Sequence, residues 1–117
     1  MSNIQLTARF KIHPDKLERF KSLSQESIQI VNKKEKGHGT LQYDWFITAD
    51  GSECVVHETF RDSDAILTHM QNLGPQLGSL MEISDFSAEL CGDASPQLQE
   101  AVKGLDVVSY AYVGGMG

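Results

Sequence analysis

The chain has 117 residues, with 16 acidic and 10 basic side chains and a formal net charge of −6. This length is typical of one domain of about 100–150 residues, so we interpret residues 1–117 as a single domain. The acidic balance argues against binding to nucleic acid, which requires clustered basic side chains, and we interpret Lys33-Lys34-Glu35-Lys36 as a solvated helix end.

The first half of the chain is expected to form a strand, a helix and a hairpin. Residues 4–12 alternate apolar and polar side chains, a period of two that is typical of a strand. A helix should begin at His13-Pro14-Asp15, because proline suits the first helical position. Strands over about 40–48 and 53–60 follow, and Ala49-Asp50-Gly51-Ser52 between them carries the Asp-Gly dipeptide of a tight hairpin.

The second half is expected to form two helices and two strands. A helix should open at Asp62 or Ser63, with a break or kink at Gly74-Pro75. Residues 84–91 alternate again as a strand. Ser95-Pro96 is a typical start for a short helix, in which Leu98, Ala101 and Val102 should point inward, and a last strand is expected from Val107 to Val113.

The element order predicts an α+β, ferredoxin-like fold, β-α-β-β-α-β, with an extra short helix and strand at the C-terminal end. Both crossover helices would cover one face of the sheet and leave the other face bare. We expect the bare face to be too apolar for a surface in water, because it would carry Phe46, Val55, Val107 and Val113. Self-association would cover it, so we predict a homodimer in which residues 93–117 form an arm toward the partner.

The sequence shows no clear pattern of a membrane span, a secretory signal or a disulfide framework. No apolar run approaches the about 18 residues of a membrane span, and no secretory signal is evident, so no membrane partner is expected. Cys54 and Cys91 are too few for a disulfide framework and lack CxxC spacing. We expect buried free thiols in a reducing cytoplasm, with a single Cys54–Cys91 bridge in a secreted protein as the alternative.

One segment resembles a known family. The strand end Val56-His57-Glu58-Thr59-Phe60, the polar cap Arg61-Asp62-Ser63-Asp64-Ala65 and the helical His69 together resemble the antibiotic-biosynthesis-monooxygenase-like proteins. The resemblance covers roughly residues 4–91 and implies a dimeric α+β barrel, in which two sheets face each other. The family includes oxygenases without a cofactor, in which the deprotonated substrate itself reduces oxygen.

The haem-degrading branch of that family is not indicated. Its pattern has an asparagine on the first strand and a tryptophan at the end of the third, where this chain has Ala8 and Phe60. No histidine follows His69 that could be an axial ligand of haem. The resemblance therefore implies that the protein has no cofactor.

Glu58 and His69 are the candidate catalytic residues. With Asp50-Gly51 at the turn, Tyr43 should lie opposite Glu58. The resemblance implies that this face of the hairpin points toward the helices. The same register is expected to place Trp45 opposite Val56 and Leu41 opposite Phe60. The predicted pocket is therefore walled by three aromatic side chains, those of Tyr43, Trp45 and Phe60.

Two functions fit this pocket. Aromatic walls with few polar groups suit an aromatic or quinol-like ligand, from which Glu58 or His69 could take a phenolic proton in a cofactor-independent monooxygenase. Alternatively, Glu58 and His69 only anchor the helix to the sheet, and the protein is a non-catalytic dimeric module that is structural or binds a small molecule.

The other histidines indicate no catalytic or metal site. Asp44 should lie across from His57 on the opposite face of the sheet, without a serine or cysteine nucleophile beside the pair. We expect His13 at the helix entry and His38 in a loop between glycines. The four histidines show no HExxH-like spacing, so no metal site is predicted.

Overall fold

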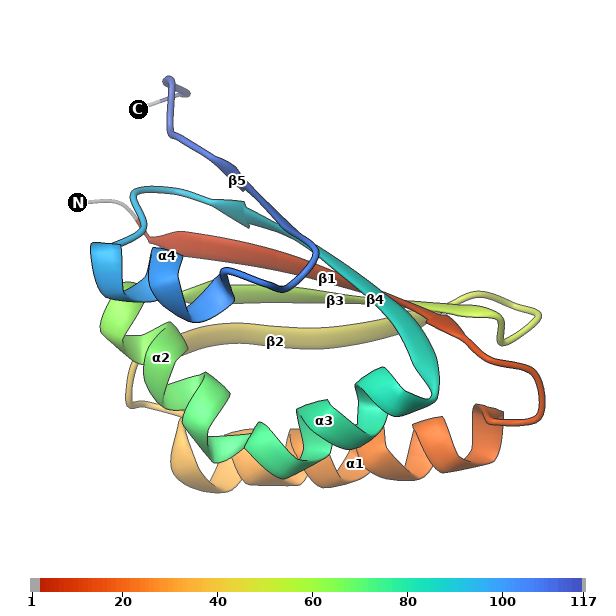
Figure 1. Ribbon diagram of the computed structural model, residues 1–117. Helices are drawn as coiled ribbons and strands as arrows, with labels where there is room; N and C mark the ends of the chain where they lie inside the picture. The colour runs from red at the N-terminus through yellow and green to blue at the C-terminus, as the bar shows by residue number, and fades with distance from the viewer. Residues whose placement is uncertain (1–2, 117) are drawn as a thin grey trace.

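A five-stranded sheet forms one layer of the molecule, and all the helices lie against one of its faces (Figure 1). The computed structural model describes residues 3–116. Its elements in chain order are β1 Ile4–Ile12, α1 Leu17–Lys34, β2 Thr40–Ile47, β3 Glu53–Phe60, α2 Ser63–Asn72, α3 Gly74–Glu82, β4 Ser84–Cys91, α4 Pro96–Val102 and β5 Val107–Tyr110.

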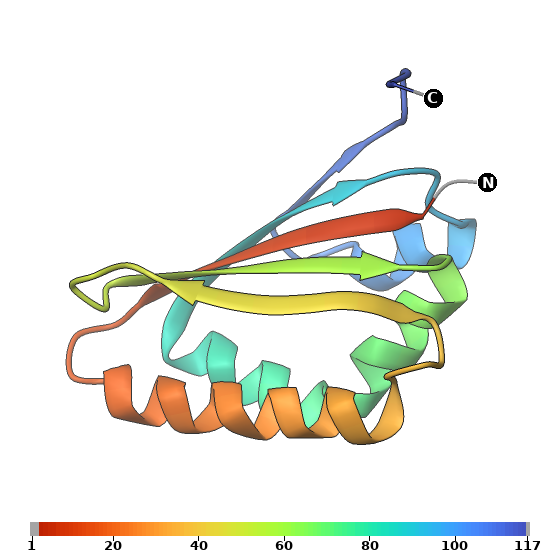
Figure 2. The same cartoon turned by 180° about the vertical axis from the view of Figure 1, so that it is seen from behind.

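The strand order is β2-β3-β1-β4-β5, with β1 in the centre. β1 pairs antiparallel with both β3 and β4, and β2 pairs antiparallel with β3. β5 adds a parallel edge beside β4, while β2 forms the other edge, at the front of Figure 2. The predicted α+β, ferredoxin-like fold with an extra C-terminal helix and strand is therefore confirmed.

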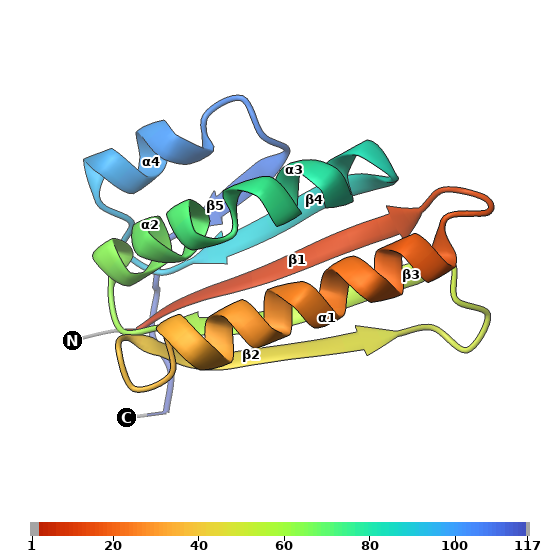
Figure 3. The same ribbon diagram turned by 90° about the horizontal axis from the view of Figure 1, so that it is seen from below.

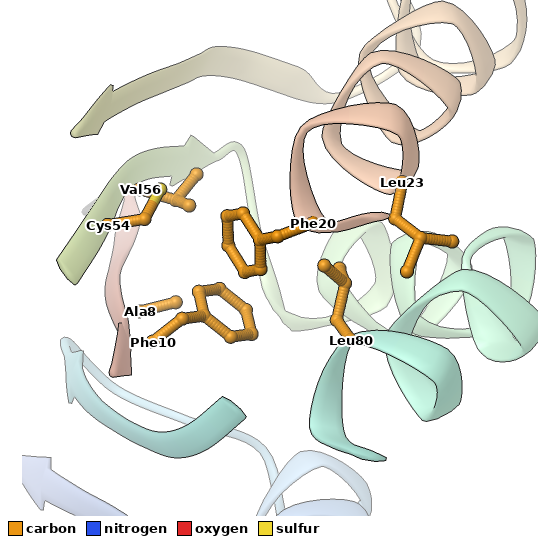
Figure 4. Packing of buried hydrophobic residues seen from close by; sticks show 7 residues of the cluster. All are labelled: Ala8, Phe10, Phe20, Leu23, Cys54, Val56 and Leu80. Carbon is orange, nitrogen blue, oxygen red and sulfur yellow. The ribbon is translucent and has the colours of Figure 1, made fainter. Parts of the chain in front are cut away.

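Two apolar clusters join the helices to the sheet. In the first, Phe10 of β1 packs against Phe20 of α1 and Trp45 of β2, with ring centroids 5.5 Å and 6.0 Å away. Figure 4 shows Phe20 on α1 pointing toward the strands, and Leu23 on α1 lying above Leu80 of α3. The second cluster gathers under α2 and α4, where Phe60 and Leu98 are fully buried. Burial of such side chains is the main source of stability in a domain of this size.

Several local expectations hold, and others were wrong. Asp62 caps α2, since its side chain accepts a hydrogen bond from the backbone N–H of Ala65 at 2.9 Å, and Ser95 caps α4 in the same way through Leu98. The first helix begins later than expected, at Leu17. Asp15 has a φ of +65°, a left-handed conformation that ends the turn after β1 and excludes this residue from the helix.

The C-terminal half also departs from expectation at three residues. Ala101 is exposed in a depression between α4 and α2, although Leu98 is buried as expected. The last strand ends at Tyr110, and the chain continues away from the sheet (Figure 1). Cys54 is a buried free thiol, but Cys91 is exposed, because it lies on the bare face at the end of β4.

The bare face of the sheet carries exposed apolar side chains, as predicted, from a partly different set of residues. Phe46 of β2 and Tyr110 of β5 are each about half exposed, and Val108 is likewise exposed. Val107 was wrongly assigned to this face: it pairs with the inward-facing Ala88 and points toward the helices. Within the described residues, no helix is long and apolar enough to cross a membrane.

Candidate functional site

Three ionisable side chains meet in the interior, between α1, α2 and β3. His69 of α2 places Nδ1 at 2.8 Å from Oε1 of Glu35 and Nε2 at 3.2 Å from Oε1 of Glu58. All three residues are buried, with 7% or less of their surface exposed. A histidine between two buried carboxylates is a charge-assisted arrangement that fixes the orientation of its ring.

Glu35 was missed by the sequence analysis, which wrongly placed it in a solvated helix end. It occupies the C-cap of α1, where Oε1 accepts a hydrogen bond from the Thr40 hydroxyl at 2.7 Å and Oε2 accepts one from the Asn72 amide at 3.1 Å. One signal was present: the buried positions of α1, Phe20, Leu23, Ser27 and Val31, continue at the same spacing to residue 35.

Glu58 lies directly opposite Tyr43, as the hairpin register predicted, and Trp45 lies opposite Val56. The predicted pair Leu41–Phe60 was wrong: Thr40 faces Phe60, because a bulge between Thr40 and Gln42 shifts the register there. The expected pairing of Asp44 with His57 is present on the bare face, where His57 also packs against Phe46.

Two buried polar atoms on the side chains next to Tyr43, those of Glu58 and Trp45, have unmet hydrogen-bonding capacity. Oε1 of Glu58 lies within ion-pair distance of His69, but it has no hydrogen-bond partner among residues 3–116. Nε1 of Trp45 is also buried without a partner in the described part of the chain. Buried polar atoms without a hydrogen bond are rare, so these atoms point to a place where a ligand or water would bind.

The pKa shifts of His69, Glu35 and Glu58 differ, and the differences indicate a separate role for each group. Burial opposes a charge on His69, but its contacts with Glu35 and Glu58 raise its pKa from 6.5 to about 9. Burial also acts on Glu35, yet His69 and the other hydrogen bonds hold its pKa below 4.5. For Glu58, burial dominates and raises the pKa. At neutral pH His69 is thus a cation, which cannot accept a proton, and Glu58 is the group whose affinity for a proton is increased.

A cavity of about 70 Å³ lies between the sheet and the helices, beside this group. Its polar lining comes from Ser27, Tyr43, Trp45, Glu58 and His69, and the rest of its wall is apolar. Phe60 does not line it. That residue is fully buried and packs on the other side of the His69 ring, with centroids 5.1 Å apart.

Four of the five candidate residues therefore surround one space. The Tyr43 ring meets the His69 ring edge-on, with centroids 5.2 Å apart, and meets Trp45 in the same manner. Burial, together with the nearby charge of Glu58, raises the pKa of Tyr43, so this hydroxyl stays neutral and can donate a hydrogen bond. The arrangement can accept a proton at Glu58 and stabilise an anion through His69 and Tyr43.

A comparison with protein families identifies the family of this chain. Residues 4–77 match the family model described as antibiotic biosynthesis monooxygenase. The chain belongs to this family. No curated protein matches the chain significantly.

Solved structures of this monooxygenase-family fold agree with the match. MupZ from Pseudomonas fluorescens superposes with a TM-score of 0.78 at 15% identity, over 100% of this chain and 95% of that chain. SnoaB from Streptomyces nogalater, a cofactor-independent oxygenase, gives 0.64 at 17% identity, over 83% and 96%. A conserved protein from Methanosarcina mazei gives 0.68 at 19%, over 77% and 91%. At these identities the likeness extends to the fold alone.

Proposed function

We propose that the protein is a cofactor-independent monooxygenase that acts on an aromatic, quinol-like small molecule, with Glu58 as the proton acceptor. The observation that carries the proposal is the buried Oε1 of Glu58, which has no hydrogen-bond partner among the described residues, on the wall of an otherwise apolar cavity. Family membership supports this class of reaction, and one structural neighbour is named as a cofactor-independent oxygenase.

The chemistry starts with a proton transfer. Glu58 takes the proton of a phenolic hydroxyl, and the cationic His69 and the Tyr43 hydroxyl stabilise the resulting anion. The apolar cavity favours this step only if the negative charge is neutralised within it, and His69 supplies that positive charge.

Oxygen then reacts with the bound anion. The phenolate gives one electron to O₂, and the two radicals combine to form a C–O bond at the ring carbon opposite the hydroxyl, which in the substrate carries a hydrogen atom. Glu58 returns its proton to the peroxide, and loss of water from the hydroperoxide leaves a quinone. One oxygen atom enters the product and the other leaves as water, and the substrate supplies all four electrons, so no further reductant is needed.

A second function is favoured by a different observation. Glu35 binds Thr40, Asn72 and His69 together, and thereby ties α1 to α2 and to the start of β2. A non-catalytic dimeric module, structural or small-molecule-binding, would use the same three ionisable groups only as an anchor. In that case replacing the Glu58 carboxylate would change stability without removing an activity.

Oxygen uptake with a panel of 3-n-alkylphenols, naphthols and anthrones tests the proposal. We expect uptake by the wild type to fall at least 100-fold in Glu58→Gln, because an amide cannot accept the proton. Glu82→Gln, at an exposed glutamate on α3, is the matched control and should keep full activity. Equal uptake by wild type and folded Glu58→Gln would exclude Glu58 as the base, and no uptake with any member of the panel would favour the non-catalytic module.

A further inference from the structure

The floor of the cavity is a single row of side chains that crosses the whole sheet. The register aligns Trp45, Val56, Ala8, Ala88 and Val107, one from each strand, and all five line the cavity. Neighbouring strands lie about 4.8 Å apart, so the part of this row from Val56 to Val107 spans roughly 14 Å.

The side chains in the middle of this row are small, and those in the two neighbouring rows are large. Ala8 and Ala88 are directly paired and almost fully buried, with 3% and 5% of their surface exposed. On one side Phe10 pairs with Phe86, with ring centroids 5.3 Å apart, and on the other side Leu6 pairs with Leu90. Two methyl groups between two ridges of large side chains form a trough one residue wide.

The two ends of the trough differ in chemistry. One end reaches Glu58, which follows Val56 by two residues on the same face of β3, and Tyr43 opposite it. The other end is formed by Val102, Leu105 and Val107, which are apolar and only half buried. Polar recognition is therefore confined to one end. The other end leads through apolar side chains toward the surface at α4 and β5; in Figure 3, β5 lies beside β4 and α4 lies beside α2.

We propose that the site takes a phenol of one ring that carries an unbranched alkyl chain, with the hydroxyl at Glu58 and the chain along Ala8 and Ala88 toward Val107. This inference rests on the proposed function and adds the substrate class. The trough is one residue wide between the pairs Phe10–Phe86 and Leu6–Leu90, and this narrow shape favours a slender ligand over a fused-ring one. Met70, whose unbranched side chain is easily displaced, lines the same space and can make room for the ring.

Binding of 3-n-alkylphenols under argon tests the inference apart from turnover. Trp45 is the single tryptophan of the chain and lines the cavity, so its fluorescence reports on occupancy. We expect the Kd to fall about threefold to fourfold for each added methylene, and to level off once the chain passes Val107. A Kd independent of chain length, or tighter binding of 2-naphthol and 9-anthrol than of every alkylphenol, would overturn the inference.

Substitutions in the trough locate the chain. Ala88→Leu should weaken binding of the long alkylphenols at least tenfold and leave phenol itself nearly unaffected, since only the chain crosses Ala88. Ala88→Val and Ala8→Val add less volume and should give smaller losses in the same order, in case the leucine variant does not fold. Gln97→Leu, at an exposed position of α4 that does not line the cavity, is the control and should bind like wild type.

These measurements separate the two proposals. A Kd that falls with the length of the alkyl chain, together with loss of binding in Ala88→Leu, supports the ligand class, whatever the oxygen-uptake assay shows for Glu58. Equal binding of long alkylphenols by wild type and by folded Ala88→Leu contradicts the position of the chain, even if Glu58 proves to be the base.

Discussion

His69 is the residue on which the site depends, because it contacts both carboxylates and both flanking aromatic rings. Its ring lies in the apolar stripe of α2, where a leucine would be expected, and it is 7% exposed. Removal of either carboxylate leaves the other with a cation, but removal of His69 leaves two like charges buried together. Replacing His69 should therefore destabilise the protein more than replacing either glutamate.

A dependence of stability on pH follows from the raised pKa of His69. This pKa is about 9 in the folded protein against an ordinary value of 6.5, so the stabilisation is complete below pH 6.5 and is lost as the pH rises through 9. We expect the free energy of unfolding in urea to fall by on the order of 2–3 kcal/mol between pH 6.5 and 9.5.

The variant His69→Gln is the comparison for that pH series. Glutamine keeps a hydrogen-bond donor but does not titrate, so the part of the fall in unfolding free energy that comes from the imidazole should be absent, and any fall that remains comes from Glu35 and Glu58. Glu58 does not mask the effect: its pKa is raised as well, so rising pH can only reduce its contribution to stability. A wild-type stability that is flat from pH 6.5 to 9.5 would contradict a charged, paired His69.

At the scale of elements, the hairpin β2–β3 was the best predicted part of the chain. The Asp-Gly turn set the register correctly over Tyr43–Glu58 and Trp45–Val56, because side-chain alternation and turn position agree there. The register failed only at Leu41, where a bulge inserts one residue, and a bulge leaves no clear mark in a single sequence.

Glu35 and the alanine pair show why the rest of the site was harder to predict. Three lysines surround Glu35 in the sequence, so its local pattern is that of a solvated helix end, and only the burial of the whole α1 face reveals it. Ala8 and Ala88 are 80 positions apart in sequence, and their pairing depends on the register between β1 and β4, which no turn connects. Long-range registers of this kind are set by packing rather than by local sequence.

At the scale of the whole molecule, the helices cover one face of the sheet and the other face is open (Figure 3). We propose that a second copy of the chain covers it, since Phe46, Val108 and Tyr110 are exposed there, and that residues 111–116 contribute to the arm. Leu98 is fully buried within its own chain, so a deletion from residue 95 would damage the core as well as the arm.

A sharper test of the dimer leaves the core intact. We expect light scattering of the wild type to give twice the 12.9 kDa mass of one chain. Phe46→Lys should give the mass of one chain, because a charge on the covered face opposes association. Truncation after Tyr110 should weaken the dimer. Gln71→Lys, at an exposed position on α2, is the control and should stay dimeric. A wild type that scatters as a monomer at micromolar concentration would refute the proposal.

The central claim is that a cationic His69 lies between Glu35 and Glu58 and leaves Glu58 as the proton acceptor of the cavity. Nitrogen-15 NMR of the His69 ring tests it most directly, because the chemical shifts report the protonation of both nitrogens. We predict that both are protonated at pH 7 and that the ring titrates near pH 9. A neutral ring at pH 7, with a pKa at or below the ordinary 6.5, would contradict this account.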